Sequence, residues 1–157
     1  MLTNDILRRI RFLLKLSDAR LLNLLNSSDF SLSPDDLDRY LAREDEEHFA
    51  LCPDEVVARF LDAVIGLKRG PSADPRAPEL PLTNNQVLKK LRVAFSLKDH
   101  DIVELMQSVG FRVGKSEINA LFRKPDQSNY RVCGDQFLRQ FLKALTRKER
   151  PDITQEC

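Results

Sequence analysis

Hydrophobic residues recur along this chain at spacings of three and four, which is typical of one face of an α-helix. The first such face comprises Ile6, Leu7, Ile10, Leu13 and Leu14. Three further faces with the same spacing lie within residues 21–25, 37–41 and 56–64. No segment alternates apolar and polar residues in the manner of a half-buried strand. The pattern therefore predicts an all-α protein.

Capping residues mark the expected helix ends. Ser33-Pro34-Asp35-Asp36 supplies an N-cap, a first-turn proline and two acids that favour a helix N-terminus. Another helix is expected to begin after Ser17, and a further one at Cys52-Pro53-Asp54 with its proline in the first turn. Gly70 follows two basic residues and is predicted to be a C-cap.

The chain repeats itself. A shift of 81 residues places residues 4–66 on residues 85–147 without a gap. The identical pairs include Asn4/Asn85, Leu7/Leu88, Arg11/Arg92, Asp45/Asp126, Cys52/Cys133, Asp54/Asp135 and Phe60/Phe141. Asn4 and Asn85 stand where N-caps are expected. The sequence thus predicts a tandem duplication of a four-helix unit.

This repeat divides the chain into four parts. We expect a first repeat over 1–70, a proline-rich linker over 71–81, a second repeat over 82–150 and a flexible tail over 151–157. A unit of this length is marginal as an independent fold. The two repeats are therefore expected to pack into one compact structure around a pseudo-two-fold axis.

Composition narrows the class of protein. Hydrophobic residues make up 42% of the chain, enough to form a core, and no apolar run is long enough for a membrane span. The N-terminus lacks the basic and apolar regions of a secretory signal, so a cytoplasmic protein is expected. The three cysteines, Cys52, Cys133 and Cys157, are an odd number, which argues against a disulfide framework.

Several motifs resemble a known family. They are Met1-Leu2-x-Asn4-Asp5-Ile6-Leu7-Arg8, Glu44-Asp45-Glu46-Glu47 with Phe49 and Cys52-Pro53-Asp54, Leu88-Lys89-Lys90-Leu91-Arg92, and Cys133-Gly134-Asp135-Gln136-Phe137-Leu138-Arg139. Together they resemble the YehS-like bacterial family, a duplicated domain of unknown function, over residues 1 to about 150. The resemblance implies a bacterial cytosolic protein and supplies no activity, ligand or catalytic residue.

Charge differs between the repeats. Residues 1–70 carry 10 basic and 13 acidic residues, a net of −3, whereas residues 82–150 carry 14 and 7, a net of +7. The helix order around Lys115 is also similar to a helix-turn-helix, with a longer link. One hypothesis is a phosphate-binding patch of Lys89, Lys90, Arg112, Lys115, Arg123, Lys124 and Arg131. The preferred interpretation is a solvated charged surface.

Possible metal ligands cluster in Glu44-Asp45-Glu46-Glu47-His48, four residues before Cys52. In the second repeat, however, Asn129 and Gln127 replace His48 and Glu46. A duplicated metal site would have been lost there, so we expect a solvated acidic turn, no metal and no cofactor.

Cys52 and Cys133 precede the fourth helix of each repeat. A helix N-terminus favours a thiolate, but Asp54 and Asp135 would oppose ionisation. We therefore expect small buried residues that pack under the helix start.

Arg11 and Arg92 occupy matched helical positions. We expect each to form a structural ion pair with the start of the fourth helix or the loop before it. The candidate partners are Asp45 or Asp54 in the first repeat and Asp126 or Asp135 in the second.

No glycine-rich phosphate loop, nucleophile elbow or paired catalytic carboxylates are evident. The leading functional interpretation is a non-enzymatic binding or interaction module whose partner is unknown, with nucleic acid and another protein both open. The alternatives are nucleic-acid binding through the basic second repeat, and an enzyme with a site between the repeats. The oligomeric state is left open.

Overall fold

The architecture comes from a computed structural model, which describes residues 1–27, 29–70 and 77–154. The described residues form helices and loops, and no strand occurs among them. The chain divides into two units, Met1–Leu82 and a second that begins at Thr83. The predicted all-α class and the tandem duplication are confirmed.

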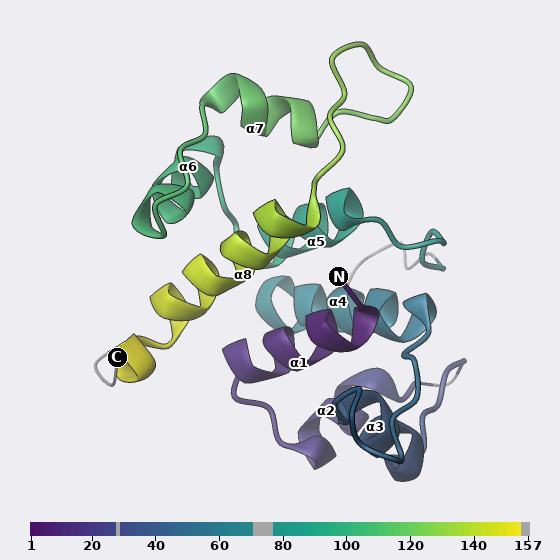
Figure 1. Ribbon diagram of the computed structural model, residues 1–157. Coiled ribbons are helices and arrows are strands. Elements are labelled where there is room, and N and C mark those ends of the chain that lie inside the picture. Colours follow the sequence, from purple (N-terminus) through teal and green to yellow (C-terminus); the bar gives the residue numbers. More distant parts are fainter. Residues whose placement is uncertain (28, 71–76, 155–157) are drawn as a thin grey trace. The chain divides into compact units, whose positions relative to one another are not determined.

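The first unit contains four helices (Figure 1): α1 (Thr3–Leu13), α2 (Asp18–Leu25), α3 (Pro34–Leu41) and α4 (Asp54–Arg69). Helix α1 packs against α3 and α4, and α2 packs against the same two helices. Each helix therefore buries its apolar face against two neighbours.

The second unit repeats this plan with α5 (Asn84–Ala94), α6 (Asp99–Ser108), α7 (Lys115–Leu121) and α8 (Asp135–Glu149). Helix α8 packs against α5 and α6, and α6 also packs against α7. One further turn, α9 (Pro151–Thr154), follows α8.

The two cores use the same register. The matched positions at which both residues are no more than 3% exposed include Leu7/Leu88, Ile10/Leu91, Leu21/Ile102, Leu37/Ile118, Phe60/Phe141, Leu61/Leu142 and Val64/Leu145. Matched burial at a constant offset shows that the apolar pattern specifies the same helix faces in both units.

Most of the capping predictions are confirmed. The Ser17 hydroxyl accepts a hydrogen bond from the N–H of Arg20, and Ser33 caps α3 with proline in the first turn. Gly70 ends α4 with φ of +90°, a conformation that glycine adopts without a steric penalty. The predicted first-turn proline of α4, Pro53, is instead the N-cap of that helix. Helix α4 therefore begins at Asp54.

The prediction that Asn4 and Asn85 are N-caps is wrong. Leu2 and Thr83 occupy those positions, and the asparagines lie inside the first turn with side chains only 0% and 8% exposed. Thr83 caps α5 reciprocally with Gln86. The asparagines instead bond to backbone groups that only the folded chain brings near them.

The linker and the tail are described in part. Residues 71–76 of the predicted linker lie outside the described residues, and residues 77–82 contain no helix. The N–H of Leu82 donates to a carboxylate oxygen of Asp54 at 2.8 Å. The segment predicted as a flexible tail begins with α9, where Arg150 pairs with Asp152 at 3.2 Å. Residues 155–157, including Cys157, lie outside the described part.

Candidate functional site

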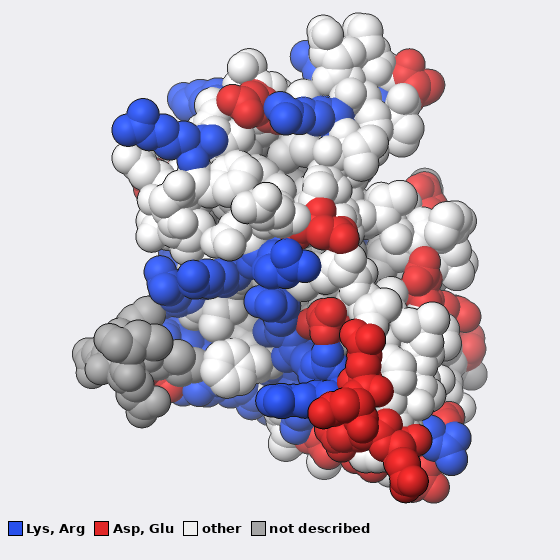
Figure 2. Space-filling model, viewed as in Figure 1, with Lys and Arg blue, Asp and Glu red and all other residues white. Residues whose placement is uncertain are grey.

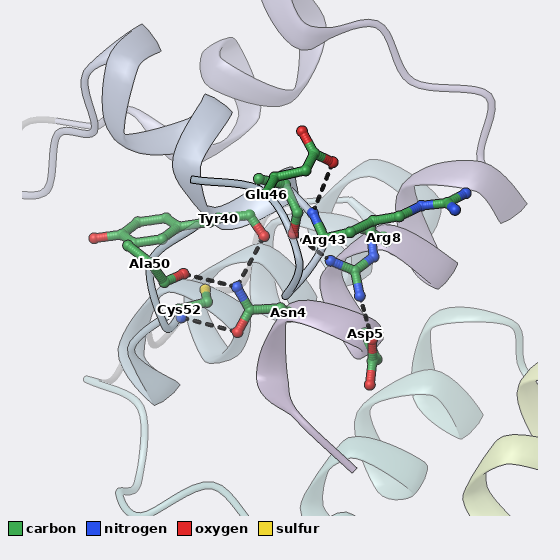
Figure 3. Close-up of polar contacts among 9 residues, drawn as sticks. Asn4, Asp5, Arg8, Tyr40, Arg43, Glu46, Ala50 and Cys52 are labelled. Carbon is green, nitrogen blue, oxygen red and sulfur yellow. Dashed lines mark hydrogen bonds and ion pairs between the residues drawn. The ribbon is translucent and has the colours of Figure 1, made fainter. Parts of the chain in front are cut away.

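Asn4 links α1 to the segment that leads into α4. Its side-chain N–H groups donate to the carbonyls of Tyr40 (3.0 Å) and Ala50 (2.9 Å), and its oxygen accepts from the N–H of Cys52 (3.0 Å). Figure 3 shows the carboxamide between Tyr40, at the end of α3, and the residues Ala50 and Cys52. We call Asn4 and these three backbone groups the first asparagine bridge.

The second repeat contains the same arrangement. Asn85 donates to the carbonyls of Leu121 (3.0 Å) and Arg131 (2.8 Å) and accepts from the N–H of Cys133 (2.9 Å). These groups form the second asparagine bridge. Because every partner is a backbone atom, the side chains around each bridge can differ while the geometry is kept.

A second residue of each first helix fixes the same segment. The Thr3 hydroxyl donates to the carbonyl of Cys52 at 2.5 Å, and the Asn84 side chain donates to the carbonyl of Cys133 at 3.1 Å. The residue just before each cysteine nevertheless projects outward. Leu51 is 62% exposed and Val132 is 71% exposed.

Cys52 and Cys133 are buried beneath the starts of α4 and α8, as expected. Burial, assisted by the nearby carboxylates of Asp54 and Asp135, raises the pKa of each thiol to about 12. The thiols are therefore protonated at neutral pH and are poor nucleophiles or metal ligands.

The predicted partners of Arg11 and Arg92 are wrong. Arg11 pairs with Asp18 at 2.5 Å and Arg92 pairs with Asp99 at 2.9 Å, at the start of the second helix of each repeat. Both arginines lie in the last turn of their helices, whereas Asn4 brings the start of α4 to the opposite end of α1. The separation along α1 is about 10 Å, too far for contact.

Arg92 makes further contacts. Its Nε–H donates to the carbonyl of Leu97 at 3.1 Å, and its guanidinium lies 4.4 Å from the ring centroid of Phe122. Arg11 donates to Leu16 in the same way. These matched arginines therefore hold the turn after the first helix of each repeat.

The acidic turn at Glu44–Glu47 is exposed. His48 lies 3.6 Å from Asp38 and 3.8 Å from Glu46. The Glu46 carboxylate accepts from the N–H of Arg43, and in the second repeat the Gln127 side chain accepts from the N–H of Lys124. Glutamate and glutamine both supply the needed oxygen, so this position caps a turn. Within the described residues no group of three possible ligands forms a metal site.

Five of the seven basic residues predicted for a phosphate-binding patch lie next to α7. Lys115 begins the helix, Arg112 precedes it, and Arg123 and Lys124 follow it. Arg131 pairs with Glu117 at 3.5 Å and so lies beside the same helix. All five are exposed, and Figure 2 shows blue side chains around the region labelled α7 in Figure 1. We call these five residues the α7 basic surface.

The other two predicted residues lie on α5. Lys89 is exposed and Lys90 is half-buried. Lys89 comes one helical turn after Asn85, whose side chain bonds to the C-terminal end of α7, so Lys89 lies on the same side of α5. Lys90 is rotated away from that side.

Sequence reasoning missed a basic stripe on α8. Arg139, Lys143 and Arg147 are exposed at intervals of four residues and therefore share one face. The spacing alone could have revealed it. The equivalent positions in the first repeat hold Ala58, Asp62 and Gly66, so this stripe belongs to the second repeat.

An open depression of about 350 Å³ lies between α6 and α8. Charged residues line it, among them Asp101, Glu104, Arg147 and Lys148. A hydrogen bond from the N–H of Lys98, with smaller effects of His100 and Lys148, holds the pKa of Asp101 below its usual value. An acid of this kind stays ionised and caps α6, unlike a general acid, whose pKa is raised.

Comparison with known proteins identifies the family. A model described as "Protein of unknown function (DUF1456)" matches residues 3–70 and again residues 84–150. The chain belongs to this family. It is also 45% identical over 151 residues to the "Uncharacterized protein YehS" of Escherichia coli (strain K12), with 95% of this chain and 97% of that protein covered. No solved structure matches the chain.

The two family matches fall on the two structural repeats, and each contains one asparagine bridge. No helix in the described part of the chain is both long and apolar enough to cross a membrane.

Proposed function

We propose that this DUF1456 protein is a non-enzymatic binding module, and that its second repeat binds the phosphate backbone of nucleic acids. The first part is supported by the chemistry of the described acids and thiols. The thiols of Cys52 and Cys133 have pKa values raised to about 12, and the pKa of Asp101 is lowered. These shifts favour structural roles over acid–base or nucleophilic catalysis.

The observation that carries the nucleic-acid proposal is a reversal of charge on one scaffold. Residues 112–131 contain five basic and two acidic residues, a net of +3. The equivalent residues 31–50 contain two basic and seven acidic residues, a net of −5. The core positions and the asparagine bridges are equivalent in both repeats, so folding does not require the difference in net charge. A binding surface on the second repeat accounts for this difference.

The dimensions of the α7 basic surface suit a phosphate backbone. Helix α7 has seven residues and is therefore about 10 Å long, with cations at both ends. Neighbouring phosphates of a nucleic-acid strand can reach both ends. The acidic residue on this helix is Glu117. Its carboxylate pairs with Arg131 and accepts a hydrogen bond from the N–H of Gly114. Backbone contacts of this type bind without reading sequence.

Fluorescence anisotropy with labelled single-stranded and duplex oligonucleotides tests the proposal over a range of salt concentrations. If about four phosphates are neutralised, affinity should fall on the order of 100-fold between 50 and 200 mM salt. Absence of salt-dependent binding at micromolar protein would overturn the nucleic-acid proposal.

The first repeat supplies a matched control. Lys124 and Arg43 occupy equivalent positions, and the N–H of each donates to a turn-capping side chain. Lys124→Ala should weaken binding and reduce the salt slope by about one phosphate. Arg43→Ala should leave both unchanged. Equal effects of the two substitutions would count against a site on the second repeat.

A further inference from the structure

The backbone of Leu51 has unused hydrogen-bonding groups. The residues on either side are fully engaged: Ala50 donates to Arg39 and accepts from Asn4, while Cys52 donates to Asn4 and accepts from Thr3. Within the described part of the chain, the N–H and C=O of Leu51 make no hydrogen bond. A buried Leu51 would make this costly, but the residue is 62% exposed.

The asparagine bridge explains why these groups point outward. One carboxamide bonds both the C=O of Ala50 and the N–H of Cys52, as the N–H and C=O of one residue in a parallel neighbouring strand would. In an extended chain, the N–H and C=O of the residue between them point to the opposite side. Asn4 thus stands in for one strand neighbour and leaves the other edge of residues 50–52 open.

The open edge is held in place before any ligand binds. Thr3 and Asn4 fix it from α1, and Pro53, in the extended conformation, leads directly into α4. An ordered edge loses little conformational entropy when a strand pairs with it. The exposed Leu51 side chain adds an apolar contact beside the two backbone groups.

We propose that this edge binds an extended, cationic peptide segment of a partner protein by strand addition at Leu51. Main-chain hydrogen bonds to the N–H and C=O of Leu51 would hold the segment, and an apolar side chain of the segment would pack on Leu51.

The acidic residues around Leu51 favour a positively charged peptide. Residues 44–55 contain six acidic residues and no lysine or arginine. The exposed acidic turn ends at Glu47, four residues before Leu51, and is closed by a bond from the N–H of Phe49 to the carbonyl of Glu46. Figure 2 shows red side chains gathered over the region labelled α3 in Figure 1. Lysine and arginine residues of an extended peptide would be attracted here.

The second repeat has the same edge with different chemistry. Val132 is 71% exposed, and the described chain offers its N–H and C=O no partner. Its surroundings, residues 125–136, contain two acids and Arg131. The second edge should therefore reject a cationic peptide, which makes it an internal control.

This inference deepens the proposed binding function: the peptide would bind the first repeat, whereas the α7 basic surface belongs to the second repeat. Oligonucleotide binding and peptide binding are measured separately, so either can fail while the other stands.

The probe is a fluorescein-labelled heptapeptide of alternating lysine and valine, titrated with the full chain. Antiparallel pairing that places a valine opposite Leu51 uses the N–H groups of the valines. N-methylation of the valines should therefore weaken binding by about tenfold or more, the effect of losing one or two hydrogen bonds and the close approach. N-methylation of the lysines leaves that edge free and should preserve binding.

Leu51→Pro tests the protein side. Proline removes the N–H of residue 51, which makes no internal bond, so the substitution deletes the proposed donor without breaking a hydrogen bond of the described fold. Leu51→Pro should weaken binding about tenfold or more, whereas Val132→Pro should not change it. If Leu51→Pro loses helical circular dichroism, the two methylated peptides decide alone. Absence of peptide binding, or equal binding of the two methylated peptides, would overturn the proposal.

Discussion

Replacing Asn4 by alanine removes the first asparagine bridge. The substitution leaves the carbonyls of Tyr40 and Ala50 and the N–H of Cys52 without their side-chain partner. The Asn4 side chain is fully buried, so water cannot replace it without opening the structure. Helix α1 itself should tolerate the change, because alanine has a higher helix propensity than asparagine.

The expected loss follows from the three backbone groups. Leaving a buried group unsatisfied costs about 1–3 kcal/mol, and partial relaxation lowers the sum, so Asn4→Ala should reduce the free energy of unfolding by about 3–5 kcal/mol. Native proteins are stable by about 5–15 kcal/mol in total. The first repeat should therefore be unfolded or close to it, and Asn85→Ala should do the same to the second repeat.

Urea unfolding followed by far-ultraviolet circular dichroism measures this loss. With a slope of about 1 kcal/mol per molar urea for so small a unit, the midpoint of its transition should fall by about 3–5 M. Leu51→Ala alters the neighbouring exposed side chain and should shift it little. A loss below about 1 kcal/mol for Asn4→Ala would refute the reasoning, because the bridge would then contribute no more than one ordinary hydrogen bond.

Asn4→Asp tests the direction of the hydrogen bonds in the first asparagine bridge. Aspartate can still accept from Cys52, but its ionised form would face the carbonyls of Tyr40 and Ala50, so we expect its pKa to rise on folding. A raised folded pKa means that stability is retained below the unfolded value of about 4 and lost as pH increases above it. The variant should therefore be closer to the wild type at pH 4 than at pH 7. The opposite order would contradict the donor assignment of the bridge.

Three further predictions concern other contacts. Arg92→Ala should cost about 2–3 kcal/mol in urea unfolding and Arg92→Lys about half as much, because lysine keeps a charge but not the planar contact with Phe122; equal losses would contradict this. Glu46→Gln should leave the melting temperature unchanged, whereas Glu46→Ala should lower stability by about 1 kcal/mol, and a loss with glutamine would point to a role for the charge. Since the pKa values of Cys52 and Cys133 rise to about 12 on folding, stability should decline from pH 9 toward pH 12, and native thiol labelling at pH 8 should be far slower than for free cysteine in a variant with serine at the third cysteine.

Much of the fold was predictable because its causes are local. Hydrophobic spacing identified the buried faces, and Ser17, Ser33 and Gly70 marked helix ends through contacts within a few residues. The repeat gave two independent examples of each buried position, such as Phe60 and Phe141, which are equivalent in the two repeats.

The errors arose where a side chain meets groups distant in sequence. The sequence predicts that Asn4 caps its own helix, but its partners lie 36 to 48 residues away. The repeat draws attention to Asp45 and Asp54 as partners of Arg11, whereas the actual partner, Asp18, is the acid nearest the C-terminal end of α1. Pairing in the alignment showed that these residues are equivalent and gave no information on what they contact.

The sequence by itself determined the helices, their apolar faces and the duplication, since helix periodicity and capping act over a few residues. It also determined the opposite charges of the two repeats. Only the tertiary structure decided that the paired asparagines hold a distant segment, that Leu51 and Val132 offer open backbone edges, and that five cations lie next to α7. The physical reason is that one carboxamide can bond any backbone group that packing brings within about 3 Å, and sequence spacing does not specify which.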